Sequence, residues 1–192
     1  MNTGGMMGRI AGVWLAPRAR ITGAVYLLYF LTAILAQFFV SRGLGVYGDA
    51  VNLIAYGFYV VLTLLFYYMF KPVNKSLSLL AAFFGLMGCA VGVLDLFHRV
   101  PSHISPLLFF GFYCLLIGYL ILRSIFLPRL LGWLLAFAGL GWLMFLSPPI
   151  AKYLSLYIEV LGILAEASLM LWLLVRGVNV QRWKEQANAA RS

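Results

Sequence analysis

Two carboxylic acids lie inside the last apolar run of the chain, where a charged side chain is most costly. Ser155, Glu159, Gly162 and Glu166 follow one another at steps of four, three and four, so they share one face of a helix. Counted from Lys152 at 1.5 Å per residue, Glu159 lies about 10 Å and Glu166 about 20 Å along that helix. An acid at the bilayer midplane costs about 2.5–3.5 kcal/mol, so we expect Glu166 to face other helices and not lipid.

Two roles are open for Glu166. No Lys or Arg occupies an apolar run at its depth, so we expect a neutral acid that shares a hydrogen bond with a neighbouring helix. One such bond contributes about 0.6 kcal/mol to helix association in a membrane. The second role is a site that binds a ligand or carries a proton, because ionisable residues within membranes are usually functional. Glu166 and Glu159 are the first candidates for that site.

Hydroxyl groups of the first and second apolar runs are expected at a similar depth. Tyr56, Tyr59 and Thr63 share one face of the second run, and Tyr29 and Thr32 belong to the first. A phenol below the membrane interface needs a hydrogen-bond partner, which is either a structural neighbour or a polar cavity. We predict that the acidic face of the last run packs against the first or second. At least one of Tyr29, Thr32, Tyr59 and Thr63 should then lie within ~3.5 Å of a carboxylate or share a polar cavity with it.

A second polar cluster follows the third apolar run. Asp95 and Arg99 are spaced for an ion pair at the end of a helix. Asp95, His98 and His103 could instead supply three metal ligands, although their spacing matches no established zinc motif. This is a weak metal candidate, and Asp95 also joins the candidate ligand- or proton-binding residues.

Signatures of common enzyme classes are missing from the chain. The sequence contains no G-x-S-x-G, H-E-x-x-H or P-loop pattern. Cys89 and Cys114 both fall inside apolar runs, so they indicate neither a disulfide framework nor a zinc cluster. We therefore expect no cofactor and no catalytic residue, and an enzyme is the least favoured class.

Six apolar runs of about 20 residues must position these side chains. They are Ile21–Val40, Val51–Phe70, Leu77–Phe97, Leu107–Leu122, Leu130–Leu146 and Leu154–Val175. Such a run is long enough to cross ~30 Å of hydrocarbon, and only a helix satisfies its own backbone there. Hydrophobic residues make up 64% of the chain and charged residues 10%, against roughly 25% charged in a soluble domain. The predicted fold is all-α: a polytopic bundle of six transmembrane helices that sits in a lipid bilayer.

The basic residues predict the orientation of this bundle. Eleven of them flank one end of the runs and three the other. The first set is Arg9, Arg18, Arg20, Lys71, Lys75, Arg123, Arg129, Arg176, Arg182, Lys184 and Arg191; the second is Arg42, Arg99 and Lys152. By the positive-inside rule both termini are cytoplasmic.

Because basic residues at the helix ends account for the +9 net charge, we expect no nucleic-acid partner. The domain division is a flexible leader (1–17), a transmembrane domain (18–178) and a basic cytoplasmic tail (179–192).

Small residues predict where the helices touch. Ala81, Gly85, Gly88 and Gly92 form one stripe, and Gly88/Gly92 is a G-x-x-x-G pair. Such a pair lets two backbones approach closely. It serves either packing within the bundle or contact with a second copy or a partner membrane protein.

Three segments resemble the family of bacterial membrane proteins named domain of unknown function 4386 (DUF4386). They are Arg20–Leu28, Gly118–Gly141 and Ala165–Asn179, in that order and spacing. The resemblance implies a six-helix integral protein of the bacterial cytoplasmic membrane, in a family without an established activity. Glu166 falls on the last of these motifs. The chain departs from the family at Phe84–Cys89, where members often carry an Arg and a Glu early in that helix.

Two functions of different class fit these features. The first is a module that binds or transports a small hydrophobic or amphiphilic molecule, with Glu159, Glu166, Tyr29, Tyr56 and Tyr59 as its polar groups. The alternative is an accessory or scaffolding subunit without a ligand, packing through its small-residue faces. An enzyme at the outer surface would need Asp95, His98 and His103 to converge.

Overall fold

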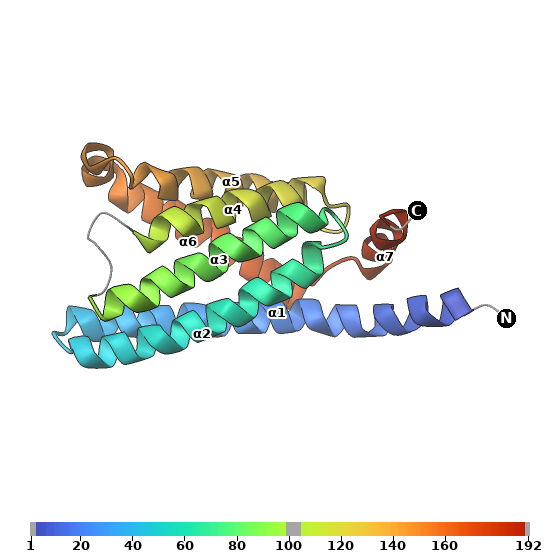
Figure 1. Ribbon diagram of the computed structural model, residues 1–192, viewed down its shortest axis with the longest axis horizontal. Coiled ribbons are helices and arrows are strands. Elements are labelled where there is room, and N and C mark those ends of the chain that lie inside the picture. Colours follow the sequence, from blue (N-terminus) through green and yellow to red (C-terminus); the bar gives the residue numbers. More distant parts are fainter. Residues whose placement is uncertain (1–2, 99–104, 191–192) are drawn as a thin grey trace.

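The computed structural model describes residues 3–98 and 105–190, and within them the side chains other than those of 3–18 and 148–151. Across these ranges the chain forms helices and turns (Figure 1). The helices are α1 (Thr3–Ser41), α2 (Gly45–Phe70), α3 (Lys75–Leu96), α4 (Pro106–Arg123), α5 (Arg129–Met144), α6 (Pro148–Val175) and α7 (Val180–Ala189).

Helix length and hydropathy make this a multi-pass membrane protein. Among the described residues, five segments are long and apolar enough to cross a membrane. They are Ala19–Ser41 of α1, the whole of α2, α3 and α4, and Lys152–Val175 of α6. Helix α5 is equally apolar but has 16 residues, a rise of about 24 Å.

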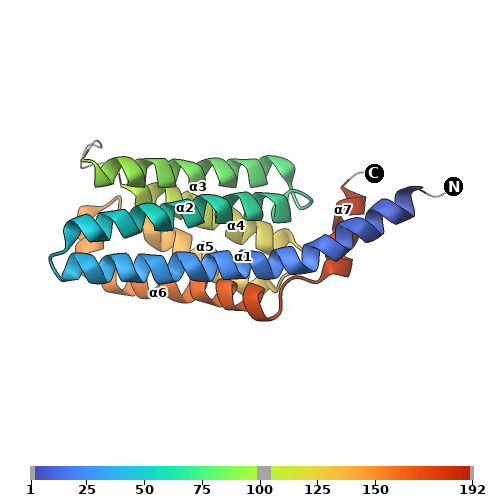
Figure 2. The ribbon, with the colours of Figure 1, turned by 90° about the horizontal axis from the view of Figure 1, so that it is seen from below.

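Helices α1 to α6 pack as a closed ring. Each contacts its neighbour in sequence, and α6 contacts α1, which closes the circuit. The connections α2–α3, α4–α5 and α6–α7 gather at one end, together with the N-terminus of α1 and with α7 (Figures 1 and 2). We call this the α7 end. The α1–α2 turn and the α5–α6 connection lie at the opposite end.

Two helices begin earlier than their hydropathy predicts. Helix α2 starts at Gly45 and α6 at Pro148, so most of the loops expected at 41–50 and 147–153 is helical. Polar residues do not end a helix unless the backbone turns, and the turn is made at Gly43, with φ of +75°. Gly43, Gly45 and Gly48 also have the G-x-G-x-x-G spacing of a dinucleotide-binding loop. That loop requires a preceding strand, and here it lies between two helices.

Helical structure continues beyond the apolar runs at both ends of the described chain. Helix α1 begins at Thr3, so residues 3–17, expected as a flexible leader, continue the first span as helix. In the tail, α7 begins after Asn179, whose side chain accepts a hydrogen bond from the Arg182 backbone N–H at 3.1 Å. Helix α7 is tied to the α4–α5 connection, where Gln186 bonds the backbone of Arg123 and Ile125.

Glycines set the closest helix contact, between α4 and α5. A Cβ added to Gly118 would lie 2.8 Å from Gly132 O and from Ala136 N. A Cβ added to Gly139 would lie 2.8 Å from Gly111 O. Distances this short leave no room for a side chain, so the small residues let the two backbones touch.

The glycine stripe of α3 is covered inside the ring. Gly88 packs under the ring of Phe110 in α4, and Gly92 lies against the phenol of Tyr56 in α2. Both glycines are buried. Of the two alternatives for Gly88/Gly92, the structure therefore favours packing within the bundle.

Large apolar side chains fill the ring towards the α7 end. The fully buried set includes Phe66, Phe70, Leu120, Ile121, Leu169 and Leu173. Phe70 stacks on Phe66 and on Phe126, with ring centroids 5.9 Å apart in both pairs. This core closes the centre of the bundle at the α7 end.

The α4–α5 contact gives a matched test. We expect Gly118→Ala to lower the free energy of unfolding by about 1–3 kcal/mol, because its Cβ would overlap backbone atoms of α5. Gly57→Ala is the control, since a Cβ there meets nothing within 4 Å. Thermal unfolding of the purified variants in detergent measures both. Equal stability of the two variants would contradict the close contact.

Candidate functional site

Glu166 lies inside the ring and joins its first and last spans. The Tyr26 hydroxyl of α1 donates a hydrogen bond to Glu166 Oε2 at 2.9 Å. Tyr26 is 3% exposed, so the bond forms away from water. One helical turn closer to the α7 end, Gly23 of α1 packs against the backbone of Leu173 and Leu174. The missing side chain lets α1 approach α6, and this places the phenol within reach of the acid.

A polar cavity of about 210 Å³ begins at Glu166. Its polar lining residues are Glu166, Tyr29, Asn52, Tyr56 and Tyr59. Its apolar lining residues are Ala33, Ala55, Leu107, Phe110 and Trp142. These residues come from α1, α2, α4, α5 and α6, so the cavity occupies the inside of the ring. Asn52 and Leu107 place it in the half of the bundle away from the α7 end.

Aromatic rings fix the shape of this cavity. Tyr59 is 3% exposed and contacts the rings of Tyr29, Phe110 and Tyr113 at centroid distances of 4.8, 4.9 and 5.7 Å. The first two contacts are edge-to-face, the geometry that aromatic pairs prefer. A side chain held on three sides has little freedom to turn. The phenols are therefore held in place around the acid.

The structure separates other predicted site residues from this cavity. Glu159 is exposed on α6, although it shares a helix face with Glu166. Figure 1 shows the reason: α6 begins beside α5 and approaches α1 only towards the α7 end. Thr63 is 1% exposed and lies beside Gly85. Its Oγ1 and the Tyr113 hydroxyl are buried with no hydrogen-bond partner among the described residues.

The polar cluster at the end of α3 is only partly described. Asp95 and His98 are both exposed at the end of α3, and His98 has φ of +53°. His103 and Arg99 fall outside the described residues. In the part of the chain that the structure describes, no three His, Cys, Asp or Glu side chains come together as a metal site would require.

Sequence reasoning missed Tyr26 as the partner of Glu166. A depth counted from the opposite end depends on where the helices begin there, and α2 and α6 begin earlier than their apolar runs. Counted from the α7 end, Glu166 lies nine residues before Val175 and Tyr26 seven after Ala19, or about 14 and 11 Å. That count places Tyr26 among the candidate partners, next to Tyr29 at about 15 Å. Asn52 shares the helix face of Tyr56 and Tyr59, so the spacing of the second run already pointed to it. Trp142 had no comparable signal, because its position depends on how neighbouring helices rotate.

The site can hold a polar group inside an apolar bundle. Glu166 offers a carboxyl group, and the phenols of Tyr29, Tyr56 and Tyr59 can each donate or accept a hydrogen bond. Phe110 and Trp142 supply flat apolar walls. The arrangement suits binding, and it can pass a proton between neighbouring hydroxyl and carboxyl groups.

A double-mutant cycle tests the Tyr26–Glu166 bond. We expect Tyr26→Phe and Glu166→Leu to be coupled by about 0.6 kcal/mol in unfolding free energy, because either change alone removes the bond. Tyr68→Phe with Glu166→Leu is the control; Tyr68 is exposed near the end of α2, and its effect should add. Additive effects for the Tyr26 pair would show that the bond contributes nothing.

Comparison with known proteins agrees with the resemblance noted in the sequence. The family model described as "Domain of unknown function (DUF4386)" matches residues 47–101 and 95–177. An uncharacterized protein of Archaeoglobus fulgidus is 25% identical over 126 residues, which cover 62% of this chain and 76% of that protein. No solved structure matches. The family model matches more than half of the chain, and the chain therefore belongs to the DUF4386 family.

Proposed function

We propose that this protein crosses the bacterial cytoplasmic membrane six times, with both termini in the cytoplasm. The eleven-to-three distribution of Lys and Arg supports this orientation. Ten of the eleven belong to described residues at the α7 end, and Arg191 falls outside the described residues. Helix α5 is the sixth membrane-crossing helix in this proposal. Although it is short, it packs between α4 and α6, and a short span is tolerated when the bilayer thins locally.

Reporter fusions test the orientation. Alkaline phosphatase, active only outside the cytoplasm, should be inactive when fused after Lys75 and active after His103. Green fluorescent protein fused to the C-terminus should fluoresce. Lys75 and His103 reporting the same side would contradict six spans with this orientation.

We further propose that the cavity at Glu166 binds a small amphiphilic or hydrophobic molecule. The observation that carries the proposal is the concentration of polar groups in one place. Glu166, Asn52 and three tyrosines surround a cavity whose other walls are apolar. Ligand sites are mostly apolar pockets with a few converging polar groups. Holding an acid there costs stability, which favours a functional reason for it.

The size of the cavity limits the ligand. At about 210 Å³ it is smaller than the 300–1,000 Å³ typical of drug-sized ligands. It fits a small molecule or the polar head of an amphiphile. The head would meet Glu166 and the phenols, and an apolar chain would lie along Phe110 and Trp142.

The core favours binding from one side over an open pore. Phe66 and Phe70 are fully buried and fill the ring between Glu166 and the α7 end. A molecule that enters from the opposite half therefore stops at Glu166. Transport would require this core to rearrange, whereas binding or sensing would not.

Paired acid variants test the binding site. Linear alkylamines, alkanols and alkanoates of increasing length are screened for an increase in melting temperature of the full-length protein in detergent. Compounds that stabilise the wild type should stabilise Glu159→Gln equally, because Glu159 is exposed. They should fail to stabilise Glu166→Gln, because that change alters the acid that lines the cavity.

A variant that fills the cavity separates binding from stability. Ala55 is 4% exposed and lines the cavity, so Ala55→Leu should block binding while leaving Glu166 in place. If Glu166→Gln lowers the melting temperature and every compound still stabilises it, the acid is only a structural bond between helices.

The scaffolding alternative has less support. Its motivating feature was an exposed G-x-x-x-G face, and both Gly88 and Gly92 are covered by other helices of the same chain.

A further inference from the structure

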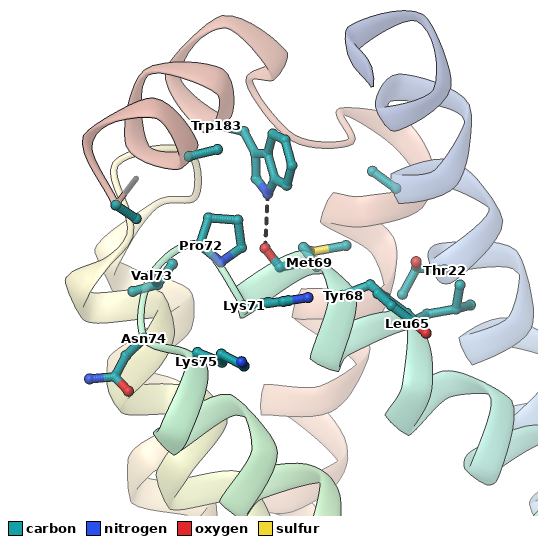
Figure 3. A pocket seen from close by; sticks show the side chains of 13 residues that line it. Thr22, Leu65, Tyr68, Met69, Lys71, Pro72, Val73, Asn74, Lys75 and Trp183 are labelled. Atoms are coloured by element: carbon teal, nitrogen blue, oxygen red, sulfur yellow. Dashed lines mark hydrogen bonds between the residues drawn. The ribbon is translucent and has the colours of Figure 1, made fainter. Parts of the chain in front are cut away.

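A second and larger cavity of about 870 Å³ lies at the α7 end. It is bordered by the start of the first span, the end of α2, the α2–α3 turn and one face of α7 (Figure 3). The Trp183 indole N–H of α7 donates a hydrogen bond to the Met69 carbonyl at 2.9 Å, as Figure 3 shows. This bond fixes α7 over the end of α2 and makes it one wall of the cavity.

The charge of this cavity is positive. Lys71 and Lys75 line it, and both are exposed. No acidic residue lines it. Of the five acidic residues in the chain, only Glu185 belongs to the α7 end, and it is exposed outside the lining. Among the residues described by the structure, neither lysine ammonium has an acidic partner. Two unpaired ammonium groups beside one cavity favour an anion.

Apart from Thr22 and Asn74, most of the remaining lining is apolar. Ala19 and Met69 are 1% and 6% exposed, and Leu65 and Ala187 complete the apolar surface. An occupant that satisfies both parts of the lining has an anionic group and an apolar chain.

The depth of the cavity identifies the source of such a molecule. Ala19 begins one membrane-crossing segment and Phe70 ends another, so the cavity lies where hydrocarbon meets headgroups. Tyr68 and Trp183 border it, and such aromatic side chains concentrate at this level. The bilayer itself presents anionic phospholipids there.

We propose that this cavity is a binding site for one anionic phospholipid. The phosphate lies between Lys71 and Lys75, and an acyl chain runs past Leu65 along the surface of α1 and α2. The site is separate from the cavity at Glu166, because the two cavities share no lining residue. Since α7 forms one wall, a bound lipid also holds α7 against α2.

Native mass spectrometry of the full-length protein in nonionic detergent tests the site. The probe is palmitoyl-oleoyl phosphatidylglycerol, and phosphatidylcholine with the same chains is the neutral comparison. We expect tighter binding of phosphatidylglycerol to the wild type. The double variant Lys71→Gln/Lys75→Gln should raise its Kd about 30-fold and abolish the preference over phosphatidylcholine.

Two further variants keep the test specific. Arg129→Gln/Lys184→Gln removes the same charge from the same end without touching the lining, so it should leave the Kd within about twofold. Ala187→Trp fills the cavity without changing charge and should weaken binding as the lysine variant does. The proposal is overturned if the lysine variant binds like the wild type, or if the control loses as much. Displacement of the lipid by equimolar inorganic phosphate would also overturn it, because the ligand would then be a soluble phosphate.

Discussion

The closure of the helix ring between its first and last spans is the contact that organises this protein. Gly23 brings α1 against the backbone of α6, and Tyr26 then reaches Glu166. Without this closure the acid would face lipid, and the cavity beside it would lose one wall. Because lipid tails are as apolar as the helices, packing and hydrogen bonds hold the spans together, and the hydrophobic effect contributes little.

The two halves of the ring are built differently. Towards the α7 end, phenylalanine, leucine and isoleucine side chains fill the centre. Towards the opposite end, tyrosines and one acid surround a cavity. A bundle that needed only stability would have filled this space, since each cavity costs packing energy. The filled centre therefore separates the cavity at Glu166 from the α7 end of the ring.

Much of the fold could be predicted from the sequence. Apolar run length predicted the five membrane-crossing segments found among the described residues, because a membrane allows few alternatives to a helix. Small residues lie where α4 and α5 touch, because only they let two backbones approach this closely. The site was harder. Tyr29, Tyr56 and Tyr59 meet Glu166 at one cavity as their depth suggested, whereas Glu159 on the same face is exposed. Its exposure depends on the divergence of α1 and α6, which no pattern within α6 records.

Helix boundaries and the position of the tail are two further features that local sequence patterns do not record. Hydropathy marked where each helix is apolar, but α2 and α6 continue beyond that point because the backbone turns only at Gly43 and near Ser147. The tail was recognised as basic, and its docking was not. Trp183 and Gln186 bond backbone groups of α2 and of the α4–α5 connection, and such long-range bonds leave no local pattern.

The closure of the ring must also wait for synthesis of the last helix, because α1 is made long before α6. Tyr26 and Glu166 are 140 residues apart. At 5–20 residues per second, a ribosome would need about 7–28 s to add the second after the first. Throughout that interval α1 has no α6 to pack against, and the inner surface of the unfinished ring stays open. The first span must therefore wait in the membrane, beside lipid or an insertion factor, until the last one arrives.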